Sequence, residues 1–589
     1  MAVYKAPLRD MRFVLDEVFK ATEFWQALPA LADVDRDIVD AVLEESAKLN
    51  ENVLFPLNRS GDEEGAQFNA GVVTTPKGFK EAFTQYAEGG WIGLGADPRW
   101  GGQGMPKTVT VMTDEILFGV NPSFALYPLL GIGAALAMSQ HASDEINDFY
   151  LPRIYSGEWA GTMCLTEPHA GTDLGIIKTR AVPNADGSYA ITGTKIFITG
   201  GEHDLASNIV HLVLAKLPDA PAGSKGISLF LVPKFMPNAD GSLGARNGVA
   251  AGNIEHKMGI KASATCVMNF DGATGWLIGK PNEGLAAMFV MMNYERLSMG
   301  IQGLGASEVA YQNAAAYSRD RLQGRSATGV KSPEKPADSL LVHPDVRRML
   351  LTTRAFNEAG RCFAMYTAKY LDLSKYAEGE QARAAADRVA LLTPVAKAFM
   401  SDRGLQGTME AQMCFGGHGY IREWGMEQYV RDTRIAQIYE GTNGIQANDL
   451  MGRKVVKNNA AYVATYVAEM REAASRLQGQ EALKADFLKA VDTLEKLTQA
   501  VIARAAGAPD EINAAAVDYL QAFGLVTYAY MFVLMAAEAG PKRDEDSFYA
   551  NKLALADFYF ARLLPELEGR ARSVEAGARS IMQFAEGYF

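Results

Sequence analysis

The stretch Arg431-Asp-Thr-Arg-Ile-Ala-Gln-Ile-Tyr-Glu-Gly-Thr-Asn443 places a single carboxylate between a tyrosine and a glycine. The apolar Ile-Tyr pair before Glu440 would desolvate this carboxylate and raise its pKa toward that of a working base. Gly441 removes the neighbouring side chain, so that backbone or ligand can come close. Thr442 or Asn443 can cap a following helix. These properties alone favour an ordinary corner between two helices, and a catalytic base is the alternative.

The same stretch resembles the R-D-x-R-x-x-x-I-Y-E-G-T-N signature of the acyl-CoA dehydrogenases. In that family the glutamate is the base that removes the α-proton of an acyl-CoA thioester, and the resemblance gives this role to Glu440. It also implies substrate contacts at Tyr439 and Gly441 and a cofactor contact at Thr442. The implied reaction yields a trans-2-enoyl-CoA, with hydride transfer to N5 of FAD. The thioester oxygen is then held by the Glu440 N–H and the ribityl 2′-hydroxyl.

Two further motifs point to a flavin. Met163-Cys-Leu-Thr-Glu-Pro-His-Ala-Gly-Thr-Asp173 is a strand followed by a turn of small and hydroxyl residues, which can face a flat heterocycle although most such turns are merely turns. It resembles the family signature L-T-E-P-x-A-G-[ST]-D, and Ile191-Thr-Gly-Thr-Lys-Ile-Phe-Ile-Thr-Gly200 matches a third family motif. The resemblance implies that Thr172 also approaches the CoA ligand. The FAD contacts it implies are Met163, Leu165, Thr166, Thr172, Phe197 and Thr199.

Two arginines and a glycine pair complete the matches. The resemblance places Arg296 near the catalytic carboxylate as a substrate contact, and it places Arg321 on the FAD pyrophosphate, often that of a neighbouring subunit. A solvated helix face is the alternative for either arginine. The family usually has an aromatic residue where this chain has Gly324, so the contacts after Arg321 stay open. Gly416 and Gly417 would let the backbone approach a phosphate or ribose of the cofactor.

The periodicity of apolar residues divides the chain into four segments. Residues 1–158 read as helical, and residues 159–280 consist of short β-rich runs broken by Gly and Asp. Helix is expected to resume at Asn282 within the segment 281–455, and residues 456–589 read as a further helical unit. This order predicts an α+β multidomain protein. The implied fold has an N-terminal helical domain, a middle β-barrel or sheet domain, a C-terminal helical bundle, and an additional C-terminal helical domain.

The bulk properties exclude several classes of protein. The chain has 589 residues, 48% of them hydrophobic, and a net charge of −12, which argues against a nucleic-acid or anionic-membrane partner. Its four cysteines are far apart and its seven histidines lack ligand spacing, so no metal site is expected. The N-terminus lacks the character of a signal or transit peptide, which predicts a cytoplasmic protein. Residues 519–539 could span a bilayer by length, but a buried bundle helix is favoured.

The outer regions resemble a narrower subgroup, the long bacterial acyl-CoA dehydrogenases that include those acting on 3-methylmercaptopropionyl-CoA. This implies a short thioether-bearing substrate, a role in dimethylsulfoniopropionate degradation or fatty acid metabolism, an electron-transferring flavoprotein as acceptor, and a homodimer or dimer of dimers. Met288, Met291 and Met292 hint at an adaptable pocket, but core packing is favoured. The alternatives are an acyl-CoA oxidase that uses O₂, a medium- or long-chain acyl-CoA dehydrogenase, and a non-catalytic scaffold on the same fold.

Overall fold

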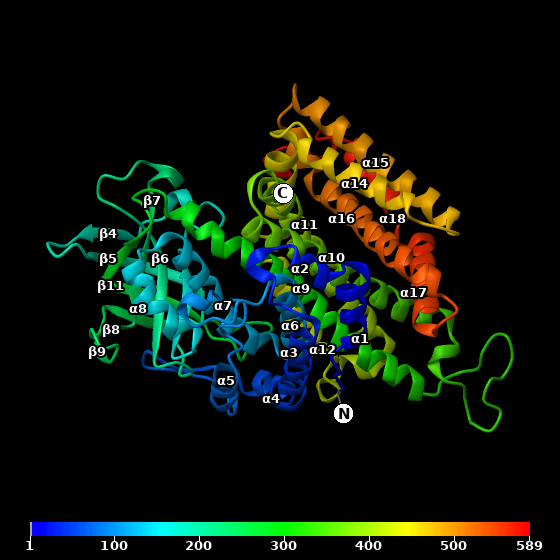
Figure 1. Ribbon diagram of the computed structural model, residues 1–589, viewed down its shortest axis with the longest axis horizontal. Helices are drawn as coiled ribbons and strands as arrows, with labels where there is room; N and C mark the ends of the chain where they lie inside the picture. Colours follow the sequence, from blue (N-terminus) through cyan, green and yellow to red (C-terminus); the bar gives the residue numbers. More distant parts are fainter. Residues whose placement is uncertain (1–2) are drawn as a thin grey trace. The chain divides into compact units, whose positions relative to one another are not determined.

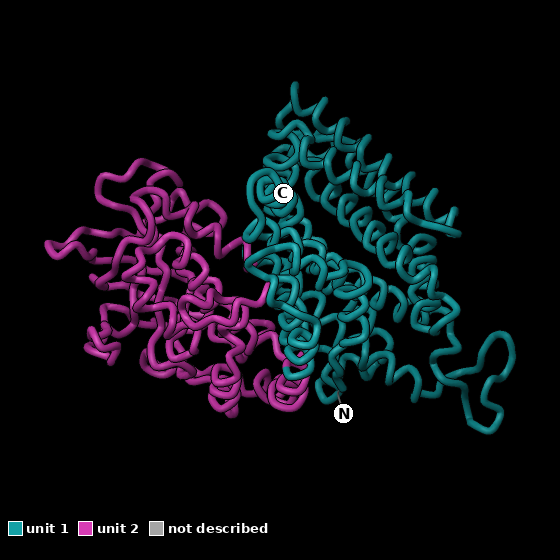
Figure 2. Tube along the Cα trace, viewed as in Figure 1, with its two compact units in different colours: residues 1–45, 107–119, 296–589 teal, residues 46–106, 120–295 magenta. Residues whose placement is uncertain are grey.

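A computed structural model describes residues 3–589 of the chain. The chain forms two compact units, each built from segments that are separate in sequence (Figure 2). Unit 1 comprises residues 1–45, 107–119 and 296–589, and unit 2 comprises residues 46–106 and 120–295.

A closed β-sheet forms the centre of unit 2. The strand order is β10-β11-β5-β4-β6-β3, and β7 pairs with both β11 and β6, so that five strands close into a ring. Every pairing is antiparallel except those of β6 with β3 and β4. This confirms the predicted β-barrel. The strands are β3 (Trp159–Cys164), β4 (Arg180–Pro183), β5 (Tyr189–Thr199), β6 (Asn208–Lys216), β7 (Ile227–Pro233), β10 (Val249–Ile254) and β11 (Thr265–Ile278).

Helices α7 (Pro122–His141) and α8 (Asp144–Tyr155) pack against β3 at close range. A Cβ on Gly161 would lie 2.8 Å from the Cβ of Ala134, so glycine permits this approach. Met288 and Met291, in the first turns of α9 (Gly284–Asp320), are fully buried in the same core, which confirms core packing for these two residues. Unit 2 also contains α4 (Phe55–Glu64), α5 (Phe79–Glu88), and two small strands, β8 (Phe235–Pro237) and β9 (Leu243–Arg246).

Two local expectations were wrong. The N-terminal segment is not wholly helical, because β1 (Gln67–Asn69) and β2 (Val72–Thr74) form a hairpin. Its two loop residues, Ala70 and Gly71, both have positive φ, which is the conformation of a tight type I′ turn. Helix α9 begins at Gly284 and not at Asn282. The N–H of Asn282 donates instead to Ser228 Oγ at 2.9 Å, and its φ of 65° is outside the helical range.

Unit 1 is a bundle of long helices (Figure 1). Helix α16 is buried along nearly its whole length and contacts α10, α11, α13, α14, α15, α17 and α18. The helices of this unit are α1 (Leu8–Arg12), α2 (Ala21–Gln26), most of α3 (Arg36–Leu49), α6 (Lys107–Val120) and the greater part of α9, followed by α10 (Pro344–Tyr376), α11 (Gly379–Cys414), α12 (Met426–Arg434), α13 (Asn443–Asn448), the π-helix η11 (Asp449–Val456), α14 (Ala461–Ser475), α15 (Glu481–Ala505), α16 (Asp510–Ala539), α17 (Ser547–Phe558) and α18 (Glu566–Glu575).

Two helical stretches have the length and apolar composition to cross a membrane, Pro122–His141 and Asp510–Lys542. Within their most apolar windows 83% and 89% of the residues are buried inside the protein. Core helices of globular proteins pass the same test. The second stretch contains residues 519–539, which the sequence predicted to be a buried bundle helix, and this prediction is confirmed.

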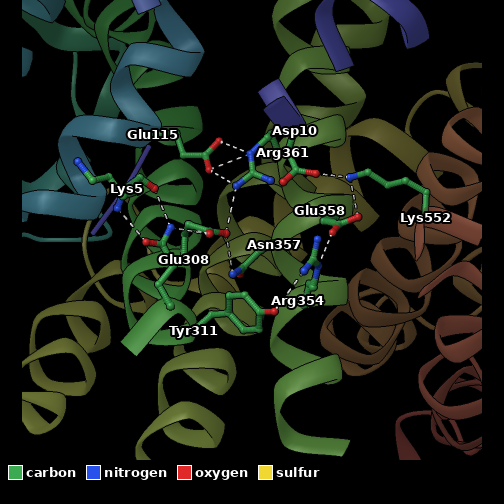
Figure 3. Close-up of polar contacts among 11 residues, drawn as sticks. Lys5, Asp10, Glu115, Glu308, Tyr311, Arg354, Asn357, Glu358, Arg361 and Lys552 are labelled. Atoms are coloured by element: carbon green, nitrogen blue, oxygen red, sulfur yellow. Dashed lines mark hydrogen bonds and ion pairs between the residues drawn. The ribbon is translucent and has the colours of Figure 1, made fainter. Parts of the chain in front are cut away.

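Buried charges connect the N-terminal segment of unit 1 to its last helices (Figure 3). The Arg361 guanidinium on α10 binds Glu115 of α6 at 2.6 Å and Glu308 of α9 at 3.1 Å. Lys552 on α17 binds Glu358 of α10 at 2.8 Å and also bonds Asp10 of α1. Burial raises the pKa of Glu115 to about 7, and the neighbouring Arg361 opposes this rise.

Gly524 allows α16 to approach α11. A Cβ at this position would lie 2.2 Å from the ring of Phe399, which is itself buried and packed edge-on against Tyr528. We therefore expect Gly524→Ala to destabilise unit 1 by about 1–3 kcal/mol through overpacking. Gly569→Ala on α18 is the matched control, because nothing lies within 4 Å of its added Cβ. Thermal unfolding measures both, and equal midpoints for the two variants would contradict this account of the contact.

Candidate active site

The link between α12 and α13 holds Glu440 in a strained conformation. Glu440 has a φ of 59° and Gly441 a φ of 82°, so two successive residues lie in the left-handed region. Glutamate rarely adopts this region, and such strain persists only where the surroundings hold it. The Gln446 amide donates to the Glu440 carbonyl at 3.0 Å. Thr442 caps α13, its Oγ1 accepting from the Ile445 N–H, as predicted.

The environment of the Glu440 carboxyl tunes its ionisation. Burial raises the pKa of Glu440 to about 7, and the positive charges of Arg296 and Lys397 oppose this rise. Burial also lowers the pKa of Lys397 to about 8, against the effect of Glu440 and Asp402. The pKa of Arg296 is lowered by burial and raised by Asp449 and Glu440. A carboxyl whose pKa is raised toward neutrality suits a group that must accept a proton.

A network of side chains frames this segment from α11. Lys397 Nζ donates to Asn443 Oδ1 at 2.8 Å. Asn443 Nδ2 donates in turn to the Asp402 carboxylate at 2.6 Å, and Gln437 Nε2 donates to the same oxygen at 2.6 Å. Since Gln437 and Asn443 lie on either side of Glu440 in the sequence, Asp402 holds both ends of the segment that carries it.

Tyr439 is fixed by α9. Its hydroxyl donates to Gln302 Oε1 at 2.6 Å, and the Gln302 amide donates to the Asp432 carbonyl at 3.2 Å.

Three residues of this site, Gln302, Lys397 and Asp402, were not predicted from the sequence. A signal existed for Lys397 alone, because it is the one charged residue in the apolar run 391–400. A lysine is rarely buried without a partner.

In unit 2 a buried ion pair ties down the turn after β3. Lys195 of β5 is fully buried, and its ammonium binds the Glu167 carboxylate at 2.8 Å and the Leu165 carbonyl at 3.0 Å. The same carboxylate accepts from the N–H and hydroxyl of Thr179. The Ile196 N–H donates to the Thr166 carbonyl at 2.9 Å. These bonds fix the turn after β3 against β5.

The residues predicted to contact FAD in unit 2 lie on this turn and on β5. Phe197 has a φ of 59° and is 59% exposed, an unusual combination for a large apolar ring. Thr172 is exposed, whereas Met163, Thr166 and Thr199 are half-buried and Leu165 is buried. An exposed aromatic ring held in a strained conformation beside a rigid hydroxyl-bearing turn fits a flat heterocycle such as isoalloxazine.

Arg321 is the first residue after α9 and is exposed. Tyr317, one turn earlier, stacks on Phe415 at 4.1 Å between ring centroids, and its hydroxyl lies 2.9 Å from His418 Nδ1. These contacts bring the end of α9 beside the Gly416–Gly417 turn. A Cβ added to either glycine would meet nothing within 4 Å, so the space around this turn is open to a ligand.

The polar stretch 324–339 after Arg321 folds around a single carboxylate. Asp338 is buried and accepts hydrogen bonds from the backbone N–H groups of Ser326, Lys331 and Ser332 at 2.8–3.1 Å. These bonds, led by that of Ser326, lower the pKa of Asp338 to about 2. The charged Asp338 carboxylate therefore holds the backbone of this loop in place.

Family models for the acyl-CoA dehydrogenases match most of the chain. They are the N-terminal domain at residues 42–158, the middle domain at residues 162–273, and the C-terminal domain at residues 282–455. A fourth model, described as acetyl-CoA dehydrogenase C-terminal like, matches residues 460–585.

Individual proteins agree with these matches over nearly the full length. The chain is 41% identical to a 3-methylmercaptopropionyl-CoA dehydrogenase of Ruegeria pomeroyi over 96% of each chain. It is 34% identical to a butyryl-CoA dehydrogenase of Syntrophomonas wolfei, covering 100% of this chain and 99% of the relative. The crystal structure of an acyl-CoA dehydrogenase complexed with FAD from Bacillus anthracis shares the fold, with a TM-score of 0.76, 20% identity, and coverage of 97% and 92%. The chain therefore belongs to the acyl-CoA dehydrogenase family and is an FAD-dependent enzyme that dehydrogenates acyl-CoA thioesters.

Proposed function

We propose that the substrate is a short acyl-CoA, 3-methylmercaptopropionyl-CoA or one of similar length, and that Glu440 removes its α-proton to give the trans-2-enoyl-CoA. The assignment of the base is supported by the position of Glu440 in the family motif and by its strained conformation, with a φ of 59°, and its raised pKa agrees with this role. The assignment of the acyl chain is supported by the relative in Ruegeria pomeroyi, which is identical at 41% of positions. The same relative supports a role in dimethylsulfoniopropionate degradation.

In this mechanism Glu440 acts in its carboxylate form, which becomes the major form as pH rises through about 7. Its backbone N–H donates to the thioester oxygen, where negative charge develops as the α-proton leaves. One such preorganised donor is worth about 3–4 kcal/mol. Bound FAD would supply the hydride acceptor for the β-carbon. Arg296 and Lys397 supply positive charge beside the carboxylate, and Tyr439 and Gly441 flank the substrate.

Two groups of residues in this chain would hold FAD. One group, on the turn after β3 and on β5, would face the isoalloxazine, and the other consists of Arg321 for the pyrophosphate together with the glycine turn and Thr442. The residues of the first group are Met163, Leu165, Thr166, Thr172, Phe197 and Thr199, and the glycines of the turn are Gly416 and Gly417. We further propose functional segments 1–158, 159–280, 281–455 and 456–589, supported by family models that end at residues 158, 273 and 455.

The enzyme is proposed to work as a cytoplasmic homodimer or dimer of dimers that passes electrons to an electron-transferring flavoprotein. Exposed apolar side chains near the end of α11 support self-association, because such patches mark interaction sites. Met413 is 65% exposed and Tyr420 is 85% exposed, and Ile421 and Trp424 lie on the same turns. Arg321 at the neighbouring end of α9 would then reach the FAD of the partner subunit.

Glu440→Gln should leave FAD content unchanged but slow the bleaching of flavin absorbance by acyl-CoA. Loss of a general base costs about 10²–10⁴-fold. Anaerobic stopped-flow measures this rate, with Glu481→Gln, an exposed residue in the first turn of α15, as the control. A Glu440→Gln variant that bleaches at the wild-type rate would remove Glu440 from the mechanism.

Arg321→Ala should lower FAD retention, because it leaves a pyrophosphate charge without its partner in the assembled enzyme. The expected loss is about 2 kcal/mol or more, measured by fluorimetric titration of the apoenzyme with FAD. Arg319→Ala is the matched control, since this arginine is also exposed and lies in the last turn of α9. Equal FAD affinities for the two variants would show that the cofactor is held differently.

Acyl chain length gives a third test. The compounds 3-methylmercaptopropionyl-CoA and butyryl-CoA should bleach the flavin much faster than palmitoyl-CoA. Chain lengths close to one another should overlap, because an apolar pocket discriminates by roughly 1–3 kcal/mol per methylene at best. The measurement is an anaerobic acyl-CoA series followed by admission of air. A preference for palmitoyl-CoA would overturn the assigned substrate, and rapid reoxidation with stoichiometric peroxide would favour an oxidase.

A further inference from the structure

Gln521 is a polar residue in an apolar helix of the C-terminal segment. It lies in α16 between Leu520 and Ala522, and only 7% of its surface is exposed. A buried amide is costly unless its donor and acceptor groups are both satisfied. The contacts of Gln521 therefore show what this position in α16 requires.

Both ends of the Gln521 amide are bonded to α11. Its Nε2 donates to the Asp402 carboxylate at 2.5 Å, and its Oε1 accepts from Arg403 Nη2 at 3.2 Å. Arg403 also binds Glu566 of α18 at 3.1 Å and lies 4.7 Å above the ring of Phe399. An acceptor on one side and a donor on the other fix the amide in one orientation.

The Asp402 carboxylate divides its two oxygens between the C-terminal segment and the segment that carries Glu440. One oxygen accepts from Gln521, and the other accepts from Gln437 and Asn443 at 2.6 Å each. A continuous path of hydrogen bonds thus leads from α16 through Asp402 and Asn443 to Lys397. Lys397 in turn interacts electrostatically with Glu440.

We propose that Gln521 is a positioning residue of the dehydrogenation reaction, which orients Asp402 so that Asn443 holds the Lys397 ammonium beside Glu440. The C-terminal helical segment then completes the catalytic loop, a role beyond covering the bundle. This inference rests on the proposed role of Glu440 as the base. The contact of Gly524 with Phe399 lies one turn further along α16 and provides packing without any hydrogen bond to the loop.

Two charged groups act on Glu440 directly, Arg296 on α9 and Lys397 on α11. Asp402 acts in turn on Lys397, and Asp449 and Arg453 of η11 act on Arg296. A cation close to a carboxylate favours the ionised form. If Lys397 loses its fixed position, less positive charge stabilises the Glu440 carboxylate, and the acid limb of the pH profile moves to higher pH.

Gln521→Met keeps the length of the side chain and removes its hydrogen bonds. The bleaching rate constant at saturating acyl-CoA should fall about 10-fold, since misplacement by about 1 Å can cost up to about 10²-fold. The midpoint of the acid limb of the pH profile should move to higher pH by at least about 0.5 unit. The acyl-CoA concentration that gives half of the maximal bleaching rate should hardly change. Thr527→Val on the same helix is the control, because it removes one buried hydroxyl whose bond, among residues 3–589, is to Tyr466, and it should move neither the rate nor the pH profile.

A double-mutant cycle tests the path itself. If Gln521 acts through Asp402, then Gln521→Met and Asn443→Ser should slow bleaching by less in combination than the product of their separate effects. Additive effects, or a Gln521→Met variant whose pH profile matches that of Thr527→Val, would overturn the inference. Gln521→Asn, which keeps the amide but shortens its reach, replaces Gln521→Met if the latter does not fold. Glu440→Gln measured alongside separates the two proposals: if it alone is inactive while Gln521→Met matches wild type, only the role of Gln521 fails.

Discussion

The arrangement of unit 1 depends on neutralising the fully buried guanidinium of Arg361. Glu115 binds it through both carboxylate oxygens and Glu308 binds it through one, so α6, α9 and α10 must meet at this charge. Lys552 imposes the same condition on α1, α10 and α17 through Asp10 and Glu358. Removing one partner from a buried pair leaves an uncompensated charge, at a cost of about 3–5 kcal/mol. These helices therefore assemble together, and α9 among them carries Gln302, which holds Tyr439 of the Glu440 segment.

The packed helices of unit 1 hold the Glu440 segment in a conformation that is unfavourable by itself. Its positive φ strains the backbone, and burial disfavours the charged form of its carboxyl. The pKa of this group rises from about 4.5 to about 7 on folding, so the folded protein binds the proton more tightly than the unfolded chain does. The contribution of Glu440 to the free energy of unfolding therefore falls as pH rises from about 4.5 to about 7. Near the upper end of this range the carboxylate form needed for catalysis becomes the major form. The surrounding bundle must supply the stability that the loop gives up.

Local patterns in the sequence predicted the parts of this site that have local causes. The Thr442 cap and the burial of α16 follow from short-range composition, and the Glu440 motif is contiguous. The partners of Asp402 are not contiguous, because Gln521 lies 119 residues away in the chain and Asn443 lies 41 residues away. No spacing rule connects such positions. The β1–β2 hairpin escaped prediction because its strands have three residues each, too few for alternation to be recognised.

The contact between Asp10 and Lys552 also sets an order of events during translation. Their separation of 542 residues means that the first helix leaves the ribosome about 30–100 s before its partner, at synthesis rates of about 5–20 residues per second. All of unit 2 emerges in this interval and can complete its barrel. Phe13, which packs against Phe548 and Tyr549 of α17, lacks these two partners throughout. A truncated or stalled chain that ends before α17 would therefore leave Phe13 without these aromatic partners, and exposed apolar groups of this kind favour aggregation.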